Sequence, residues 1–138
     1  MTAYVDASAL LRVVLREPGP AVDLRAFDLL VSSELIGVET LRTIDRLRLT
    51  GTLTTEEAAA RAQRARDWLD AVDLLLVRAP ILSRASDPLP VPLGTLDAIH
   101  LVTALAWRER LDEALIVATH DAALGLAARS YGFDVVGT

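Results

Sequence analysis

Short apolar runs alternate along this chain with longer segments of helical periodicity, and this alternation limits the possible folds more than any other feature. The strand candidates are Ala3–Val5, Leu29–Val31, Val72–Val77, Ala114–Ala118 and Phe133–Val136. The helix candidates are Ala7–Arg16, Ala21–Phe27, Glu34–Thr50, Thr54–Ala71, Ala79–Ala85, Thr95–Arg110 and Asp121–Tyr131. Parallel neighbouring strands need crossover connections, so strands alternating with helices predict an α/β fold whose parallel sheet carries helices on both faces.

Capping and turn residues delimit several of these segments. Thr54 and Glu57 form a capping-box pattern, in which each side chain satisfies a backbone donor of the other. Ser32 and Ser33 offer hydroxyls to the first turn of the helix that follows them. The three prolines within Asp87–Pro92 forbid a helix and predict a stiff surface loop before the strongly amphipathic helix at 95–110.

Length and composition predict one compact domain over residues 1–138. Hydrophobic residues make up 52% of the 138 positions, enough for a single core. No apolar run reaches the roughly 18 residues needed to span a bilayer, so we expect a cytoplasmic protein with no membrane contact. The absence of cysteine excludes disulfides, cysteine zinc sites and thiol catalysis. Any metal ion must therefore be bound by oxygen or histidine.

The charged residues exclude further kinds of chemistry. A net charge of −5 argues against a protein that holds nucleic acid mainly through a broad basic surface, but it is compatible with a nuclease. All fourteen basic residues are arginine. Lysine-dependent chemistry, such as a Schiff base or a phosphate-loop lysine, is thus excluded.

Four acids stand at places that suggest chemistry, and each has a simpler structural interpretation. Asp6 follows a strand candidate directly and Asp121 comes just beyond another, and at such places an acid can either serve a site or cap the next helix. Asp97 lies in the first turn of a helix if Thr95 is its N-cap, and there the helix dipole stabilises a carboxylate. Glu39 lies inside a helix, where it could simply be part of a solvated face.

These acids come from different segments, and the carboxyl edge of a parallel sheet can bring such segments together. Carboxylates crowded together repel one another unless they are protonated or bind a metal ion. Oxygen-only ligation favours Mg²⁺ or Mn²⁺, which phosphate-transfer enzymes use to activate water and to stabilise the departing oxygen.

The segments YVDASALL, SSELIGVETLR, LDAIHLVTAL and VATHDAAL resemble the four acidic motifs of PIN-domain proteins, particularly VapC toxins of bacterial VapBC toxin–antitoxin systems. The resemblance covers essentially the whole chain. It implies that Asp6, Glu39, Asp97 and Asp121 bind the metal ion and carry catalysis. It also implies a three-layer α/β/α sandwich with a central parallel sheet of order 3-2-1-4-5.

The same resemblance implies an activity and partners. The activity would be that of a Mg²⁺- or Mn²⁺-dependent endoribonuclease, in which water attacks an RNA phosphodiester in line and leaves 5′-phosphate and 3′-hydroxyl ends. The RNA substrate could be tRNA or rRNA. VapC-like proteins generally form homodimers and bind a VapB antitoxin whose C-terminal segment lies over the active site. An antitoxin arginine could then satisfy the acids in place of metal.

Three further side chains match positions near the acidic motifs. Ser8 and Thr119 could hydrogen-bond a carboxylate or a metal-bound water, or could cap local turns. Arg42 could contact RNA phosphate, orient Glu39 or form an intrahelical salt bridge.

The remaining predictions concern the histidines and other functions. We expect His100, three residues after Asp97, to pack or hydrogen-bond rather than bind metal. We expect His120 to be a surface histidine, with a role in binding metal or substrate as the alternative. One alternative function is a catalytically inactive PIN-like domain that serves only as a regulatory or antitoxin-binding partner. Another is a different doubly wound protein, but a receiver domain would need a lysine that this chain lacks.

Overall fold

The computed structural model describes residues 1–138. Its strands are β1 (Thr2–Val5), β2 (Leu29–Ser33), β3 (Val72–Leu75), β4 (Leu115–Ala118) and β5 (Asp134–Val136). Its helices are α1 (Ala7–Leu15), α2 (Leu35–Leu49), α3 (Thr55–Leu69), α4 (Ala79–Ala85), α5 (Thr95–Leu111) and α6 (Ala122–Ser130), with a short 3₁₀ turn, η1 (Leu24–Ala26). None of the helices combines the length and apolar character needed to cross a bilayer.

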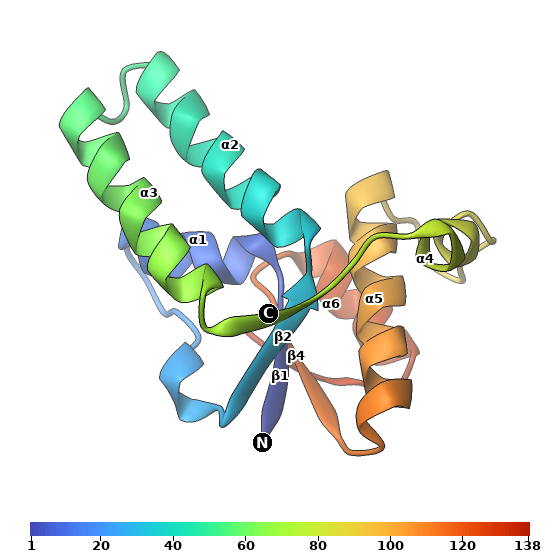
Figure 1. The fold of residues 1–138 in the computed structure, drawn as a ribbon. Coiled ribbons are helices and arrows are strands. Elements are labelled where there is room, and N and C mark those ends of the chain that lie inside the picture. The colour runs from blue at the N-terminus through green and yellow to red at the C-terminus, as the bar shows by residue number, and fades with distance from the viewer.

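The five strands form one parallel sheet in the order β3-β2-β1-β4-β5, which confirms the expected α/β architecture and strand order. Figure 1 labels the three central strands, β2, β1 and β4. β1 is the central strand and pairs with β2 on one side and β4 on the other. All four of its residues are buried, so the chain leaves this strand at the middle of the sheet's carboxyl edge. The residue that follows β1 is Asp6.

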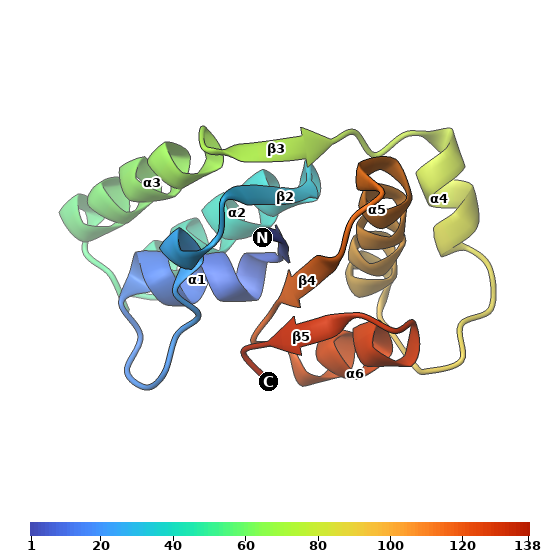
Figure 2. The same ribbon diagram turned by 90° about the horizontal axis from the view of Figure 1, so that it is seen from below.

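Side-chain alternation along β1 divides the core between the two faces of the sheet. Ala3 and Val5 belong to a cluster that also contains buried residues of α1, α2 and α3. Tyr4 points the other way, into a cluster with residues of α5 and α6. Figure 2 shows these two groups of helices on opposite sides of the sheet, with α4 packed beside α5. The molecule is therefore a three-layer sandwich.

The structure corrects the bounds of two predicted segments. Only Leu24–Ala26 of the predicted helix Ala21–Phe27 is helical, as one 3₁₀ turn capped by Asp23. The third strand ends at Leu75 rather than Val77, because the amide of Val77 turns away to donate to the Glu34 carboxylate at 2.7 Å.

The helix predicted to be strongly amphipathic is buried around most of its first half. α5 carries an unbroken run of eight buried residues from Ala98 to Leu105. It lies between the sheet, α4 and α6, so it has no fully solvated face there. Its polar members, His100 and Thr103, must therefore find partners inside the protein.

The predicted helix caps at Thr54 and Ser33 are present, but the one at Ser32 is not. Thr54 and Glu57 form the complete capping box at the start of α3. The Ser33 hydroxyl accepts from the amide of Leu35, but the Ser32 hydroxyl instead donates to the carbonyl oxygen of Val5 at 2.6 Å. Ser32 therefore ties β2 to the carboxyl end of β1 rather than capping α2.

Candidate active site

Asp6 lies at the carboxyl end of the central strand and is only 4% exposed. It is the N-cap of α1, since its Oδ1 accepts from the amide of Ala9 at 3.0 Å. Burial raises the pKa of Asp6, while hydrogen bonds from Thr119, Ser8 and Ala9 act in the opposite direction. Asp6 therefore caps α1 and also lies at the carboxyl edge of the sheet, so the two interpretations of this residue are compatible.

Two hydroxyls hold the Asp6 carboxylate from either side. The Ser8 hydroxyl lies 2.7 Å from Oδ1 and 2.9 Å from Oδ2, and the Thr119 hydroxyl donates to Oδ2 at 2.7 Å. Ser8 also accepts from the amide of His120, and Thr119 accepts from the amide of Asp121. These bonds join the ends of β1 and β4 into one network that fixes the orientation of Asp6.

The end of β5 holds Thr119 in place. The Thr119 amide donates to the carbonyl oxygen of Val136, and Gly137 follows with a φ of +102°. A Cβ at Gly137 would stand 2.3 Å from the Thr119 carbonyl oxygen, so only glycine allows this approach.

Asp97 and Asp121 lie near Asp6 at the same edge. Asp121 follows β4 and caps α6, accepting from the amide of Leu124 at 2.9 Å. Asp97 is half-buried in the first turn of α5, whose N-cap is Gly94 rather than the expected Thr95. Burial raises the pKa of Asp97, and the carboxylate of Asp121 raises it further. Smaller effects in the same direction come from Asp6 and Glu39, while His100 acts in the opposite direction.

Glu39 reaches the site from α2 through a buried histidine. Its Oε1 lies 2.5 Å from Nε2 of His100, a residue of α5 that is 1% exposed. The other ring nitrogen, Nδ1, lies 2.6 Å from the hydroxyl of Tyr4 on the central strand. Burial, together with the charges of Asp6 and Glu39, raises the pKa of Tyr4 well above its usual value, so the phenol keeps its proton.

The sequence prediction for His100, packing or a hydrogen bond rather than metal ligation, agrees with these contacts, but sequence reasoning missed its link to Glu39 and Tyr4. Two signals were available. Tyr4 lies in a strand expected to be buried, where a phenol needs a partner. His100 follows Asp97 by three residues and so lies on the same side of the helix.

Arg42 does not contact Glu39. Its guanidinium pairs with Asp45 at 2.9 Å, one of the alternatives considered from the sequence, and its side chain is 67% exposed. Arg42 and Glu39 nevertheless line the same groove, of about 350 Å³, between α2 and the start of α5. The remaining lining residues of this groove are Val38, Thr43, Arg46 and Leu96.

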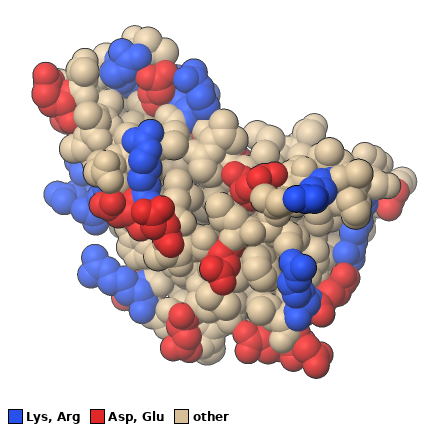
Figure 3. Space-filling model, viewed as in Figure 1, with Lys and Arg blue, Asp and Glu red and all other residues tan.

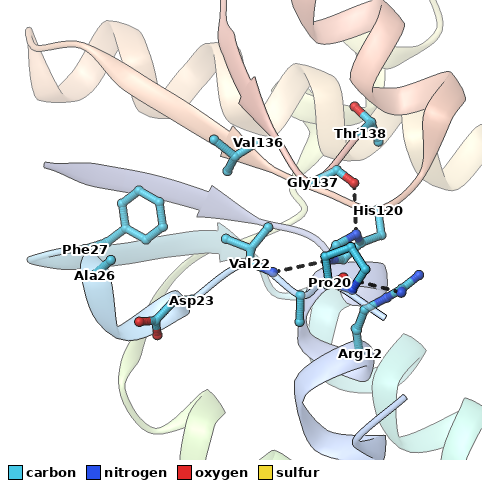
Figure 4. Close-up of a pocket in the computed structure, with 11 residues that line it drawn as sticks. Arg12, Pro20, Val22, Asp23, Ala26, Phe27, His120, Val136, Gly137 and Thr138 are labelled. Atoms are coloured by element: carbon cyan, nitrogen blue, oxygen red, sulfur yellow. Dashed lines mark hydrogen bonds between the residues drawn. The ribbon is translucent and has the colours of Figure 1, made fainter. Parts of the chain in front are cut away.

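His120, expected to be a surface histidine, is half-buried and lies against backbone. Its Nε2 accepts from the amide of Val22, and its Nδ1 lies 2.9 Å from the carbonyl oxygen of Gly137 (Figure 4). It forms part of the wall of a cavity of about 660 Å³ that also touches Arg12 and Phe27. Both ring nitrogens are occupied by these contacts, and neither faces an acid of the site.

The four acids are chemically suited to bind a divalent cation, but their side chains are too far apart in this structure to bind one ion together. None of Asp6, Asp97 and Asp121 forms an ion pair, so no cation of the chain neutralises them. Hard oxygen donors of this kind suit Mg²⁺ or Mn²⁺. No three acidic or histidine side chains lie close enough together to hold one ion as they stand.

The face of the molecule drawn in Figure 3 has no extended basic patch, because arginines and acids are interspersed on it. Arg42, Arg48 and Arg84 each pair with an acid. This agrees with the net charge of −5.

Comparison with known proteins identifies the family. The PIN domain family matches residues 3–129 of the chain. The chain is 35% identical over 136 residues to Ribonuclease VapC46 of Mycobacterium tuberculosis (strain ATCC 25618 / H37Rv), covering 96% of this chain and 95% of that protein. It is 30% identical over 130 residues to Ribonuclease VapC47 of Mycobacterium tuberculosis (strain CDC 1551 / Oshkosh), covering 94% and 92%. The acids at the carboxyl edge of this sheet therefore belong to a VapC-type member of the PIN-domain family.

Proposed function

We propose that this chain is the toxin of a type II toxin–antitoxin system and acts as a Mg²⁺- or Mn²⁺-dependent endoribonuclease. It would work as a single PIN domain over residues 1–138, in the cytoplasm. Water attacks the phosphorus of an RNA phosphodiester, the bond to the 3′ oxygen breaks, and the products carry 5′-phosphate and 3′-hydroxyl ends. The names of the two relatives, both ribonucleases, support this choice of reaction.

The observation that carries the proposal is the placement of acids from separate segments at the carboxyl edge of the sheet. Asp6 and Asp121 follow β1 and β4, and Thr119 bonds to both of them. Burial raises the pKa of Asp97, and the charges of Asp121, Asp6 and Glu39 raise it further, which supports their proximity at this edge. A fold gains no stability from such a cluster. A cation that binds there relieves the repulsion, and a bound divalent ion supplies activated water and stabilises the departing oxygen.

In this proposal the acids bind the ion and do not attack the substrate covalently. Asp6, Glu39, Asp97 and Asp121 are the ligands. Ser8 and Thr119 orient Asp6, because both hydroxyls donate to its carboxylate. Arg42 would contact RNA phosphate from the neighbouring groove, exchanging its bond to Asp45 for a phosphate oxygen.

The proposed partners are a VapB-type antitoxin, a second copy of the chain, and RNA, with tRNA and rRNA as the substrate candidates. Val38 and Leu96 support a protein partner near the site, because both are about half exposed and lie beside Glu39 in the same groove. Light scattering of the purified chain measures whether it is a homodimer.

Cleavage of a structured RNA by the purified chain tests the activity. Mg²⁺ or Mn²⁺ should support cleavage and EDTA should stop it. Asp6→Asn should lower kcat by at least about 100-fold, because losing a charged ligand removes several kcal/mol of transition-state stabilisation. Asp67→Asn makes the same change at an exposed acid of α3 and should cut like wild type. Undiminished cleavage by Asp6→Asn would contradict the proposal.

A second candidate function is a catalytically inactive PIN-like domain that only binds a regulatory or antitoxin partner. The absence of three side chains at ligating distance favours it. Calorimetric titration with Mn²⁺ separates the two candidates. An enzyme binds the ion, and Asp97→Asn or Asp121→Asn weakens that binding. An inactive domain shows no binding that depends on these residues.

A further inference from the structure

A chain of hydrogen bonds connects the central strand to Glu39 through the protein core. The Tyr4 hydroxyl lies 2.6 Å from Nδ1 of His100, and Nε2 of His100 lies 2.5 Å from Oε1 of Glu39. Tyr4 and His100 are 0% and 1% exposed, and their rings meet edge-on with centroids 5.8 Å apart. The imidazole is thus held on both nitrogens and cannot turn without breaking a buried contact.

The chemistry of Glu39 and Tyr4 determines which atoms donate in their hydrogen bonds with His100. The carboxylate of Glu39 can only accept, so Nε2 of His100 carries the hydrogen that it receives. The phenol of Tyr4 is able to donate to Nδ1 and so keeps the hydrogen on Nε2. The histidine therefore presents one fixed donor to Glu39.

Glu39 depends on this donor more than the other acids do. His100 is the only residue that hydrogen-bonds its carboxylate, whereas Asp6 has three partners and Asp121 is held by the amide of Leu124. Glu39 also has a longer side chain, which is 20% exposed and so can turn toward solvent when the donor is lost.

We propose that His100, held by Tyr4, is the positioning residue that fixes the Glu39 carboxylate for binding a divalent cation. This inference rests on the proposed function, in which Glu39 is a ligand. The imidazole positions Glu39 through one hydrogen bond: one carboxylate oxygen accepts from Nε2 and the other stays available. Partners of metal ligands typically change metal affinity by about 10- to 100-fold when they are replaced.

A pair of substitutions at His100 tests the inference. In His100→Gln, the amide nitrogen can occupy the place of Nε2 and donate to Glu39. In His100→Asn, the shorter amide reaches only the place of Nδ1, so the hydrogen bond to Glu39 is lost. Thr103→Val is the matched control, because Thr103 is equally buried on α5 but its hydroxyl bonds only to the carbonyl of Ile99.

The Mn²⁺ dissociation constant, measured by calorimetry, is the first readout. We expect His100→Asn to raise it by about 10-fold or more. His100→Gln should restore most of the affinity, and Thr103→Val should match wild type. Equal losses in both His100 variants, or no loss in His100→Asn, would overturn the inference. If His100→Asn does not fold, Tyr4→Phe replaces it, because it removes only the hydroxyl, and an unchanged dissociation constant in Tyr4→Phe would then overturn the inference.

A second readout needs neither metal nor RNA. The ¹³Cδ resonance of Glu39, assigned in the ion-free protein, should move in His100→Asn and stay near its wild-type position in His100→Gln. If wild type neither binds Mn²⁺ nor cuts RNA, the proposed function fails, but this resonance still decides whether His100 positions Glu39. A resonance that does not move in His100→Asn would overturn the inference even in an active ribonuclease.

Discussion

The Asp6 carboxylate accepts from the amide of Ala9 and from the hydroxyls of Ser8 and Thr119, and burial still raises its pKa. A buried acid with this many donors is held in one orientation, which is what a metal ligand requires. The cap and the candidate ligand are compatible because the carboxylate has two oxygens with several acceptor positions. Asp121 repeats the arrangement at the next strand, where it caps α6.

Removing the Thr119 hydroxyl should destabilise the protein. Thr119→Val keeps the side-chain shape but takes a donor from buried Asp6 and an acceptor from the amide of Asp121. We expect the free energy of unfolding in urea to fall by about 1–3 kcal/mol.

Thr40→Val is the control for this change. Thr40 is fully buried, and its hydroxyl has no partner, so the same substitution there should be neutral or stabilising. Similar losses at the two positions would mean that the hydrogen bonds to Asp6 and Asp121 contribute nothing specific.

At the scale of elements, α2 and α3 form a helical pair on one face of the sheet, and a connection containing Gly51 and the Thr54 capping box joins them. α2 carries Glu39, whereas the start of α3 is exposed. A substitution at the start of α3 should therefore change the stability of the protein without changing the chemistry of the site.

Thr54→Ala removes the cap of α3. We expect it to lower the free energy of unfolding by about 0.5–2 kcal/mol, because the amide of Glu57 loses its acceptor. Chemical denaturation measures this loss, and calorimetry should find the Mn²⁺ affinity unchanged. Thr52→Ala, at an exposed position in the same connection, should change stability by less than about 0.5 kcal/mol. A large change in metal affinity in Thr54→Ala would show that the capping box and the site are coupled.

At the scale of the whole molecule, the sheet edge concentrates acids that the fold does not neutralise. The ion-free protein should gain thermal stability when one of these charges is removed. Asp97→Asn is the best choice, since burial and then the charge of Asp121, with smaller effects of Asp6 and Glu39, disfavour the ionised form of Asp97. We expect it to raise the ion-free Tm relative to wild type.

Mn²⁺ should make wild type more stable than Asp97→Asn, the reverse of the ion-free comparison. At 100 times its dissociation constant, the ion should stabilise wild type by about 2.7 kcal/mol and Asp97→Asn by much less. Scanning calorimetry with and without Mn²⁺ measures both effects, and Asp67→Asn serves as the charge-matched control. An ion-free Asp97→Asn less stable than wild type would contradict the electrostatic interpretation of the site.

The sequence by itself determined the order of strands and helices and which segments carry the acids. Local signals are enough for this, because apolar periodicity, caps and prolines act over a few residues. It also supported the parallel sheet, and the resemblance of four motifs supplied the strand order that the structure confirms. The weak local predictions failed where tertiary contacts compete, as at Val77, whose amide bonds to Glu34 instead of extending β3.

Only the tertiary structure decided which side chains meet. Glu39 and His100 are 61 residues apart, and the packing of α2, β1 and α5 brings their atoms within hydrogen-bond distance. Arg42 instead turns to Asp45, a neighbour on its own helix. A sequence pattern shows which residues can share an edge or a face. The direction of each side chain is decided by the buried donors and acceptors around it, which come from distant parts of the chain.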